Sequence, residues 1–106
     1  KGLGQEVCRI FTEHYDVHVL CYLFYIFCNP EDVKPHRRDW PFLVTWRDAA
    51  AAFLPGLQID LDILPSKCEV FNVFANRPHL KFSNEKAKRV LGWEPKDDLV
   101  QTYTKV

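Results

Sequence analysis

The first fifteen residues carry large apolar side chains at intervals of three and four positions. These side chains belong to Leu3, Val7, Ile10, Phe11 and Tyr15. Because an α-helix has about 3.6 residues per turn, this spacing places all five on one face. The pattern therefore predicts an amphipathic helix that runs from the start of the sequence to about Tyr15.

The next segment, from Val17 to Phe27, is apolar almost throughout and is rich in β-branched and aromatic residues. A strand with one face in water alternates apolar and polar residues, whereas a strand buried on both faces does not. The segment therefore predicts a single central strand of a parallel sheet, with helices above and below it. It is too short for a membrane helix, which needs about 20 apolar residues.

A proline-rich loop and an alanine-rich helix are expected next. Residues 29–41, "NPEDVKPHRRDWP", contain three prolines and mixed charges, which is typical of a loop. Residues 45–54, "TWRDAAAAFL", predict a helix with Thr45 as its N-cap and Asp48 in its first turn. We expect Pro55 and Gly56 to end this helix.

The last two predicted elements are a strand and a helix. Residues 68–76, "CEVFNVFAN", alternate well enough to form a strand, and residues 83–93, "SNEKAKRVLGW", predict a helix. Ser83 is the expected N-cap, and Gly92 suits a left-handed C-cap. The order helix, strand, loop, helix, strand, helix indicates the closing half of an α/β sheet in one domain that spans residues 1–106.

Composition excludes several partners. Fourteen basic residues balance fourteen acidic ones without long blocks of either sign, so we expect neither nucleic acid nor a membrane surface as partner. The four cysteines form no C-x-x-C pair, and three of them lie in apolar runs. A reduced, cytoplasmic environment is the expectation that follows.

Five short motifs resemble, in the same order, segments of the extended short-chain dehydrogenases/reductases, the NAD-dependent epimerase/dehydratase family. "KGLGQEVCR" resembles the continuation of the family's Y-x-x-x-K motif, and "HVLCYLFYIFCNPED" resembles its strand that ends in a glycine-proline turn. "VTWRDAAAAF", "EVFNV" and "LGWEPKDD" resemble its V-x-x-R-D-x-A-x-A segment, its late strand and its C-terminal signature. The resemblance implies the C-terminal half of a Rossmann-like, doubly wound parallel sheet with a small cap on the substrate side.

The resemblance implies that Lys1 is both catalytic and cofactor-binding. In the family this lysine binds the nicotinamide ribose and lowers the pKa of a tyrosine four residues upstream, which exchanges a proton with the substrate. That tyrosine and the glycine-rich dinucleotide loop would precede Lys1. The implied cofactor is NAD or NADP, because the residue that distinguishes the two would also lie upstream.

The remaining implied site residues line the substrate side. Ile26 stands where the family commonly has an asparagine beside the nicotinamide or substrate, so that wall of the site becomes apolar. Arg37 and Arg38 lie in the short loop and are candidates for binding a substrate carboxylate through paired hydrogen bonds. The short loop resembles the compact hexuronate-dehydrogenase-like branch, which implies a small sugar or sugar acid as substrate.

The full-length protein would thus be an oxidoreductase or epimerase that acts by hydride transfer. The resemblance also implies a homodimer, because many family members are dimers. The isolated fragment is expected to be inactive. A non-catalytic binding module derived from the same fold is the alternative. We expect no metal site, although His14 and His18 are four residues apart, because Asp16 and Val17 indicate that the helix ends between them.

Overall fold

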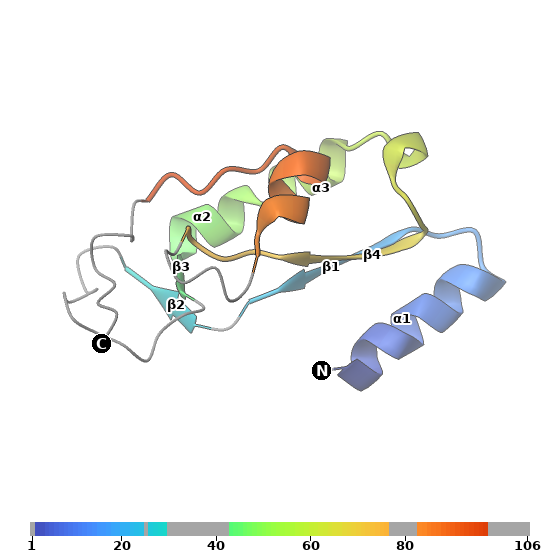
Figure 1. Cartoon of the computed structure of the whole chain (residues 1–106). Coiled ribbons are helices and arrows are strands. Elements are labelled where there is room, and N and C mark those ends of the chain that lie inside the picture. The colour runs from blue at the N-terminus through green and yellow to red at the C-terminus, as the bar shows by residue number, and fades with distance from the viewer. Residues whose placement is uncertain (1, 25, 30–42, 77–82, 98–106) are drawn as a thin grey trace.

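The computed structural model describes residues 2–24, 26–29, 43–76 and 83–97, and it has a mixed α/β architecture (Figure 1). Its elements, in chain order, are α1 (Gly2–His14), β1 (Val19–Leu23), β2 (Ile26–Cys28), β3 (Leu43–Thr45), α2 (Trp46–Ala51), α3 (Phe53–Gln58), the 3₁₀ turn η2 (Leu61–Ile63), β4 (Cys68–Asn72) and the π-helical turn η3 (Ala87–Leu91). The predicted mixture of helices and parallel strands is therefore confirmed, but the predicted order is not, because β3 was not expected and the first predicted strand is divided into β1 and β2.

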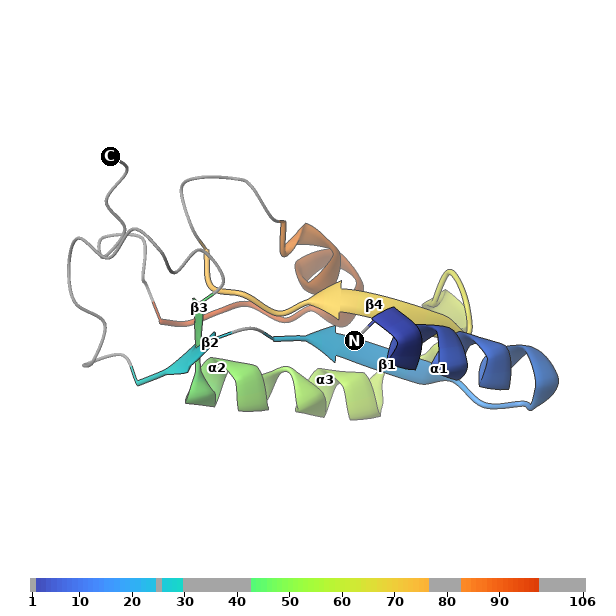
Figure 2. The ribbon, with the colours of Figure 1, turned by 90° about the horizontal axis from the view of Figure 1, so that it is seen from below.

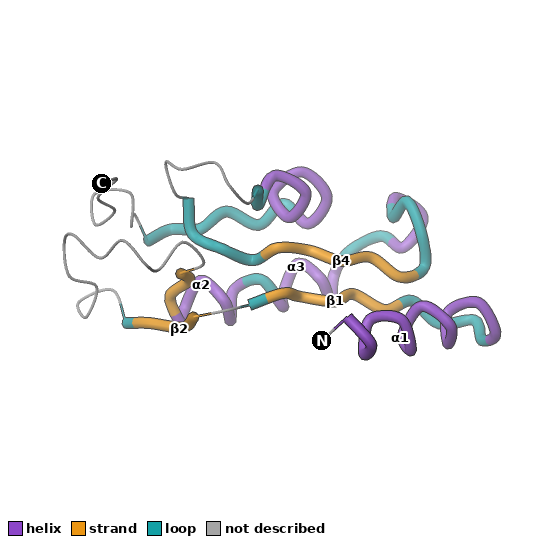
Figure 3. Tube along the Cα trace, turned by 60° about the horizontal axis from the view of Figure 1, so that its bottom comes forward, coloured by secondary structure: helices purple, strands orange, loops and turns teal. Residues whose placement is uncertain are grey.

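The strands form two small parallel sheets. β1 pairs with β4 in the register Val19 to Cys68, and β2 pairs with β3 in the register Ile26 to Leu43. The prediction of one continuous strand from Val17 to Phe27 is wrong, because this path carries two short strands (Figure 3). The reason is a change of pairing partner along this path. Its first part, β1, pairs with β4, whereas its second part, β2, pairs with β3.

Helices cover both faces of the β1–β4 sheet. In Figure 1, α1 lies below the two strands, while α2, α3 and the helical turn around η3 lie above them. Figure 2 shows the same sheet from below, with α1 nearest the viewer. The main core is on the upper side, where Phe71 packs with Ala52, Ala87 and Trp93.

The alanine-rich helix differs from its prediction at its C-terminal end. It is interrupted at Ala52 and then continues as α3 through Pro55 and Gly56, so these two residues do not end it. Pro55 is tolerated because it lies in the first turn of α3, where a backbone N–H has no partner within the helix. The predicted N-cap is confirmed, since the Thr45 hydroxyl accepts a hydrogen bond from the Asp48 N–H at 3.2 Å.

At the ends of the last predicted helix, the hydrogen bond to Ser83 and the left-handed Gly92 are confirmed, whereas η3 itself begins after Lys86, which has no side-chain cap. The Ser83 hydroxyl accepts a hydrogen bond from the Glu85 N–H at 3.1 Å. Gly92 has a φ of 72°, the left-handed conformation that only glycine adopts without strain. Of the helices within the described residues, none has the length and apolar character required to cross a membrane.

Candidate functional site

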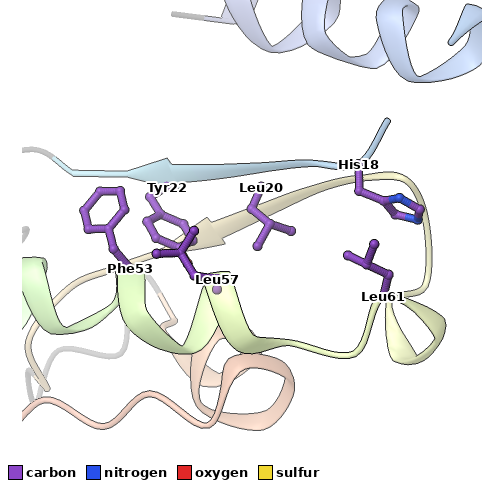
Figure 4. Close-up of a pocket in the computed structure, with 7 residues that line it drawn as sticks. His18, Leu20, Tyr22, Phe53, Leu57 and Leu61 are labelled. Atoms are coloured by element: carbon purple, nitrogen blue, oxygen red, sulfur yellow. The ribbon is translucent and has the colours of Figure 1, made fainter. Parts of the chain in front are cut away.

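A cleft of about 300 Å³ lies between β1 and α3 (Figure 4). β1 contributes Leu20 and Tyr22, and His18 lies just before it. The opposite wall comes from α3 and η2, and the complete lining is His18, Leu20, Tyr22, Phe53, Gly56, Leu57 and Leu61. The alternation of side chains along a strand explains why Leu20 and Tyr22 face the same cleft.

Tyr22, on the β1 side of this cleft, is held in place by two contacts. Its hydroxyl donates a hydrogen bond of 2.8 Å to the carbonyl oxygen of Ala52, and its ring packs on Phe53 at a centroid distance of 4.8 Å. The contact depends on Gly56, because a Cβ at that position would lie 2.0 Å from the Tyr22 hydroxyl oxygen. Gly56 therefore allows the close approach of α3 to β1.

The lining determines what this cleft can bind. Burial raises the pKa of the Tyr22 hydroxyl, so it is a neutral hydrogen-bond donor at neutral pH. Aromatic and aliphatic side chains around a single imidazole suit an apolar ligand group.

Asp48 is the centre of a polar cluster outside the cleft, where two segments distant in sequence meet. Asp48 is 2% exposed, and its two carboxylate oxygens accept hydrogen bonds of 3.0 Å from the N–H groups of Lys96 and Asp97. The buried Trp93 indole donates to the Asp48 carbonyl oxygen at 2.9 Å. The structural role predicted for Asp48 in the first turn of its helix is therefore confirmed and extended.

Asp97 completes this cluster. Its carboxylate accepts hydrogen bonds from the Thr45 hydroxyl and from the Arg47 guanidinium, including one of 2.7 Å from Nε. The Arg47 hydrogen bonds hold the pKa of Asp97 below its ordinary value, against the opposing effect of burial. We call Thr45, Arg47, Asp48, Trp93 and Asp97 the junction, because they join the start of α2 to the C-terminal segment.

Glu69 of β4 is a further buried carboxylate on the upper side of the sheet. Burial alone would raise its pKa, but hydrogen bonds from Lys86 and Ser66 outweigh that effect and lower it. The Ser66 hydroxyl donates at 2.8 Å, and the Lys86 ammonium forms an ion pair with the other oxygen. Because both partners are in place, Glu69 is an ionised structural group.

The structure describes one of the four site residues implied by the resemblance. Ile26 is half-buried in β2 and packs against the small cluster of Cys28, Leu43 and Ala75. Lys1, Arg37 and Arg38 lie outside the described residues, as does most of the predicted loop at 29–41.

The cleft was not predicted from the sequence. His18 was considered only as a partner of His14, but α1 ends at His14, whereas His18 lines the cleft. Gly56 was the available signal, since a glycine inside a helix often marks a close approach. Within the described ranges, no group of three His, Cys, Asp or Glu side chains is placed to bind a metal ion.

Comparison with known proteins adds no relative. The chain matches none of the protein-family models, curated proteins or solved structures against which it was compared.

Proposed function

We propose that the chain is the C-terminal part of an NAD(P)-dependent oxidoreductase or epimerase with a Rossmann-like sheet. The complete enzyme would transfer a hydride between a nicotinamide and a hydroxyl or carbonyl group of a sugar or sugar acid. Lys1 would bind the nicotinamide ribose, Ile26 would form an apolar wall near the nicotinamide, and Arg37 and Arg38 would bind a substrate carboxylate.

The junction is the observation that carries this proposal. Asp48 belongs to the segment that resembles V-x-x-R-D-x-A-x-A, while Trp93 and Asp97 belong to the segment that resembles the C-terminal signature. The two segments are 45 residues apart and meet through the Trp93 indole and the Asp48 carboxylate. The two segments are therefore neighbours in the fold, as their place in one domain of the proposed family requires.

The arrangement of the strands gives further support. β1 and β4 are parallel and are covered by helices on both faces, as α/β folds with crossover connections require. The connection from β1 to β4 passes through α2 and α3, which pack on the upper face. Such units build doubly wound sheets when further parallel strands are added.

The decisive experiment begins with the coding sequence upstream of Lys1. The proposal requires a tyrosine four residues before Lys1 and a glycine-rich turn further upstream. In the longer protein, Lys1→Met should abolish nicotinamide reduction, whereas Lys67→Met, at an exposed surface lysine, should leave it intact. Absence of both upstream features, or full activity of Lys1→Met, would contradict the proposal.

The isolated chain provides a complementary test. Residues 1–106 should neither reduce NAD or NADP nor bind either one tightly, because the pyrophosphate site and the proton-transfer tyrosine are assigned to the upstream half. Nicotinamide reduction by these residues alone, followed by absorbance, would contradict the division of roles proposed here.

A non-catalytic binding module is the second candidate, and the cleft between β1 and α3 favours it. That cleft is formed entirely by described residues of this chain and has an apolar lining. A stand-alone module predicts that residues 1–106 are monomeric and unfold in one cooperative transition. Sedimentation distinguishes it from the enzyme fragment, for which we expect self-association through exposed apolar surface.

A further inference from the structure

Three cysteines come together between α1 and the β1–β4 sheet. Cys8 lies on α1, Cys21 on β1 and Cys68 on β4, and all three are half-buried free thiols. Because Val19 pairs with Cys68 and Cys21 pairs with Val70, Cys21 and Cys68 point to the same face of the sheet. Cys8 and Cys21 line the same groove between α1 and β1.

Cys21 is the central thiol of this cluster. Burial, followed by the proximity of Cys68 and Cys8, raises the pKa of Cys21 to about 11. At neutral pH it is therefore a protonated thiol and a poor nucleophile. Any reaction of the cluster with an electrophile must begin at a different sulfur, with Cys21 as the second partner.

A groove of about 430 Å³ between α1 and β1 gives access to Cys8 and Cys21 together. On the helix side, Gln5, Cys8 and Thr12 are the less exposed positions, whereas the large apolar residues of α1 are exposed. α1 therefore faces the sheet with its shorter side chains.

Strand geometry distinguishes the two disulfides that Cys21 could form. A disulfide requires Cα atoms within about 7 Å of each other. Cys21 and Cys68 are diagonal neighbours, displaced by one strand spacing and two residues, which corresponds to about 8 Å between their Cα atoms. The strand register does not set the distance from Cys8 to Cys21, because Cys8 lies on α1 and not on a paired strand.

We propose that Cys8 and Cys21 form a peroxide-reactive dithiol that closes to a disulfide joining α1 to β1. The Cys8 sulfur attacks one oxygen of hydrogen peroxide, the O–O bond breaks, and Cys8 sulfenic acid and water are formed. The Cys21 sulfur then attacks the Cys8 sulfur, loses its proton and displaces hydroxide as a second water. The two thiols together lose two electrons and two protons, and the peroxide is reduced to two waters.

Peptide mapping of the oxidised full chain tests this proposal. The chain is treated with a small molar excess of hydrogen peroxide, alkylated under denaturing conditions and digested with trypsin. We expect a monomeric product about 2 Da lighter, in which the peptide carrying Cys8 is joined to the peptide carrying Cys21. Cys28 lies in that second peptide as well, so a Cys28→Ser variant must retain the same link.

The other cysteine variants complete the test. Cys8→Ser must abolish the intramolecular link to Cys21, whereas Cys68→Ser must retain it. A link between Cys21 and Cys68 in the unmodified chain would overturn the proposal, as would disulfide-linked dimers as the main product. Because the mapping is done first on the unmodified chain, a variant that fails to fold does not affect the conclusion.

Discussion

The two faces of the β1–β4 sheet are covered in opposite ways. On the upper face, Phe71 is fully buried beneath α2, α3 and the helical turn around η3, and Trp93 is 3% exposed. On the lower face, α1 has the sequence of an amphipathic helix, yet its large apolar side chains point away from the sheet. Leu3 is 80% exposed, and Phe11 is 54% exposed.

The difference separates local helix formation from tertiary packing. α1 has its own local support on its exposed side, where Arg9 forms ion pairs with Glu6 and Glu13. The upper face depends on contacts between distant segments, such as the junction of Asp48 with Trp93 and Asp97. Substitutions on the upper face should therefore affect the global free energy of unfolding far more than those on the exposed side of α1.

Trp93→Ala tests the upper face with the largest expected effect. The substitution removes a buried indole and leaves the Asp48 carbonyl oxygen without its hydrogen-bond donor. We expect the free energy of unfolding to fall by about 3–5 kcal/mol, measured by urea denaturation followed by circular dichroism.

Trp46→Ala is the matched control for this substitution. Trp46 is 57% exposed and stacks on Phe27 at a centroid distance of 4.3 Å, so its loss should cost about 1 kcal/mol. Equal losses for the two tryptophans would show that the junction does not contribute more than an exposed aromatic pair.

A pair of glycine substitutions compares the two faces with a smaller expected effect. Gly56→Ala adds a Cβ 2.0 Å from the Tyr22 hydroxyl, so Tyr22 must move and its hydrogen bond to Ala52 is lost. We expect a loss of about 1–3 kcal/mol in urea denaturation. Gly4→Ala in α1 meets no atom within 4 Å and should instead stabilise by up to about 1 kcal/mol.

Removing the clash provides the control for this pair. In a Tyr22→Phe background, which lacks the hydroxyl, Gly56→Ala should cost less than in the unmodified chain. An unchanged cost in that background would show that the Tyr22 hydroxyl is not the group that Gly56 accommodates.

The sequence predicted the local features well because they depend on neighbouring residues. The caps at Thr45 and Gly92 and the hydrogen bond from Glu85 to Ser83 require only a side chain or a conformation near the helix end, and all three are confirmed. The parallel pairing of the strand that begins at Cys68 also agrees with the predicted fold class.

The features that the sequence did not predict depend on contacts between distant residues. The division of the apolar run into β1 and β2 follows from where β3 and β4 lie. The helical continuation through Pro55 depends on the interruption at Ala52, and the cleft depends on α3 approaching β1 over Gly56. Periodicity contains no information on any of these contacts.

The pH dependence of stability also tests the junction, with a smaller expected change in the free energy of unfolding. The pKa of Asp97 is lowered from its ordinary value near 3.8, mainly by hydrogen bonds from Arg47. Its stabilising contribution is therefore complete above that ordinary value and is lost as the pH falls through the lower pKa of the folded state. Because Arg47 is exposed, we expect this contribution to be about 1 kcal/mol or less.

Two variants isolate this contribution in urea denaturation between about pH 6 and about pH 3. Asp97→Asn should lose the corresponding part of the acid dependence, while Glu69, whose pKa is also lowered, continues to titrate in both proteins. Arg47→Gln should move the loss to higher pH, because it removes the group that lowers the pKa of Asp97. Identical profiles for all three proteins would contradict the assignment.

Leu3→Gln tests the lower face and should have the smallest effect. Leu3 is 80% exposed on α1, so replacing it removes little buried apolar area and changes the free energy of unfolding by about 0.5 kcal/mol or less. The same substitution at the fully buried Leu43 of β3 should be strongly destabilising, because it buries an amide without a partner. If Leu3→Gln were as destabilising as Leu43→Gln, the apolar side of α1 would have to be buried in solution. Sedimentation of the unmodified chain and of Leu3→Gln would then show whether self-association provides that burial, since the substitution would shift the chain toward the monomer.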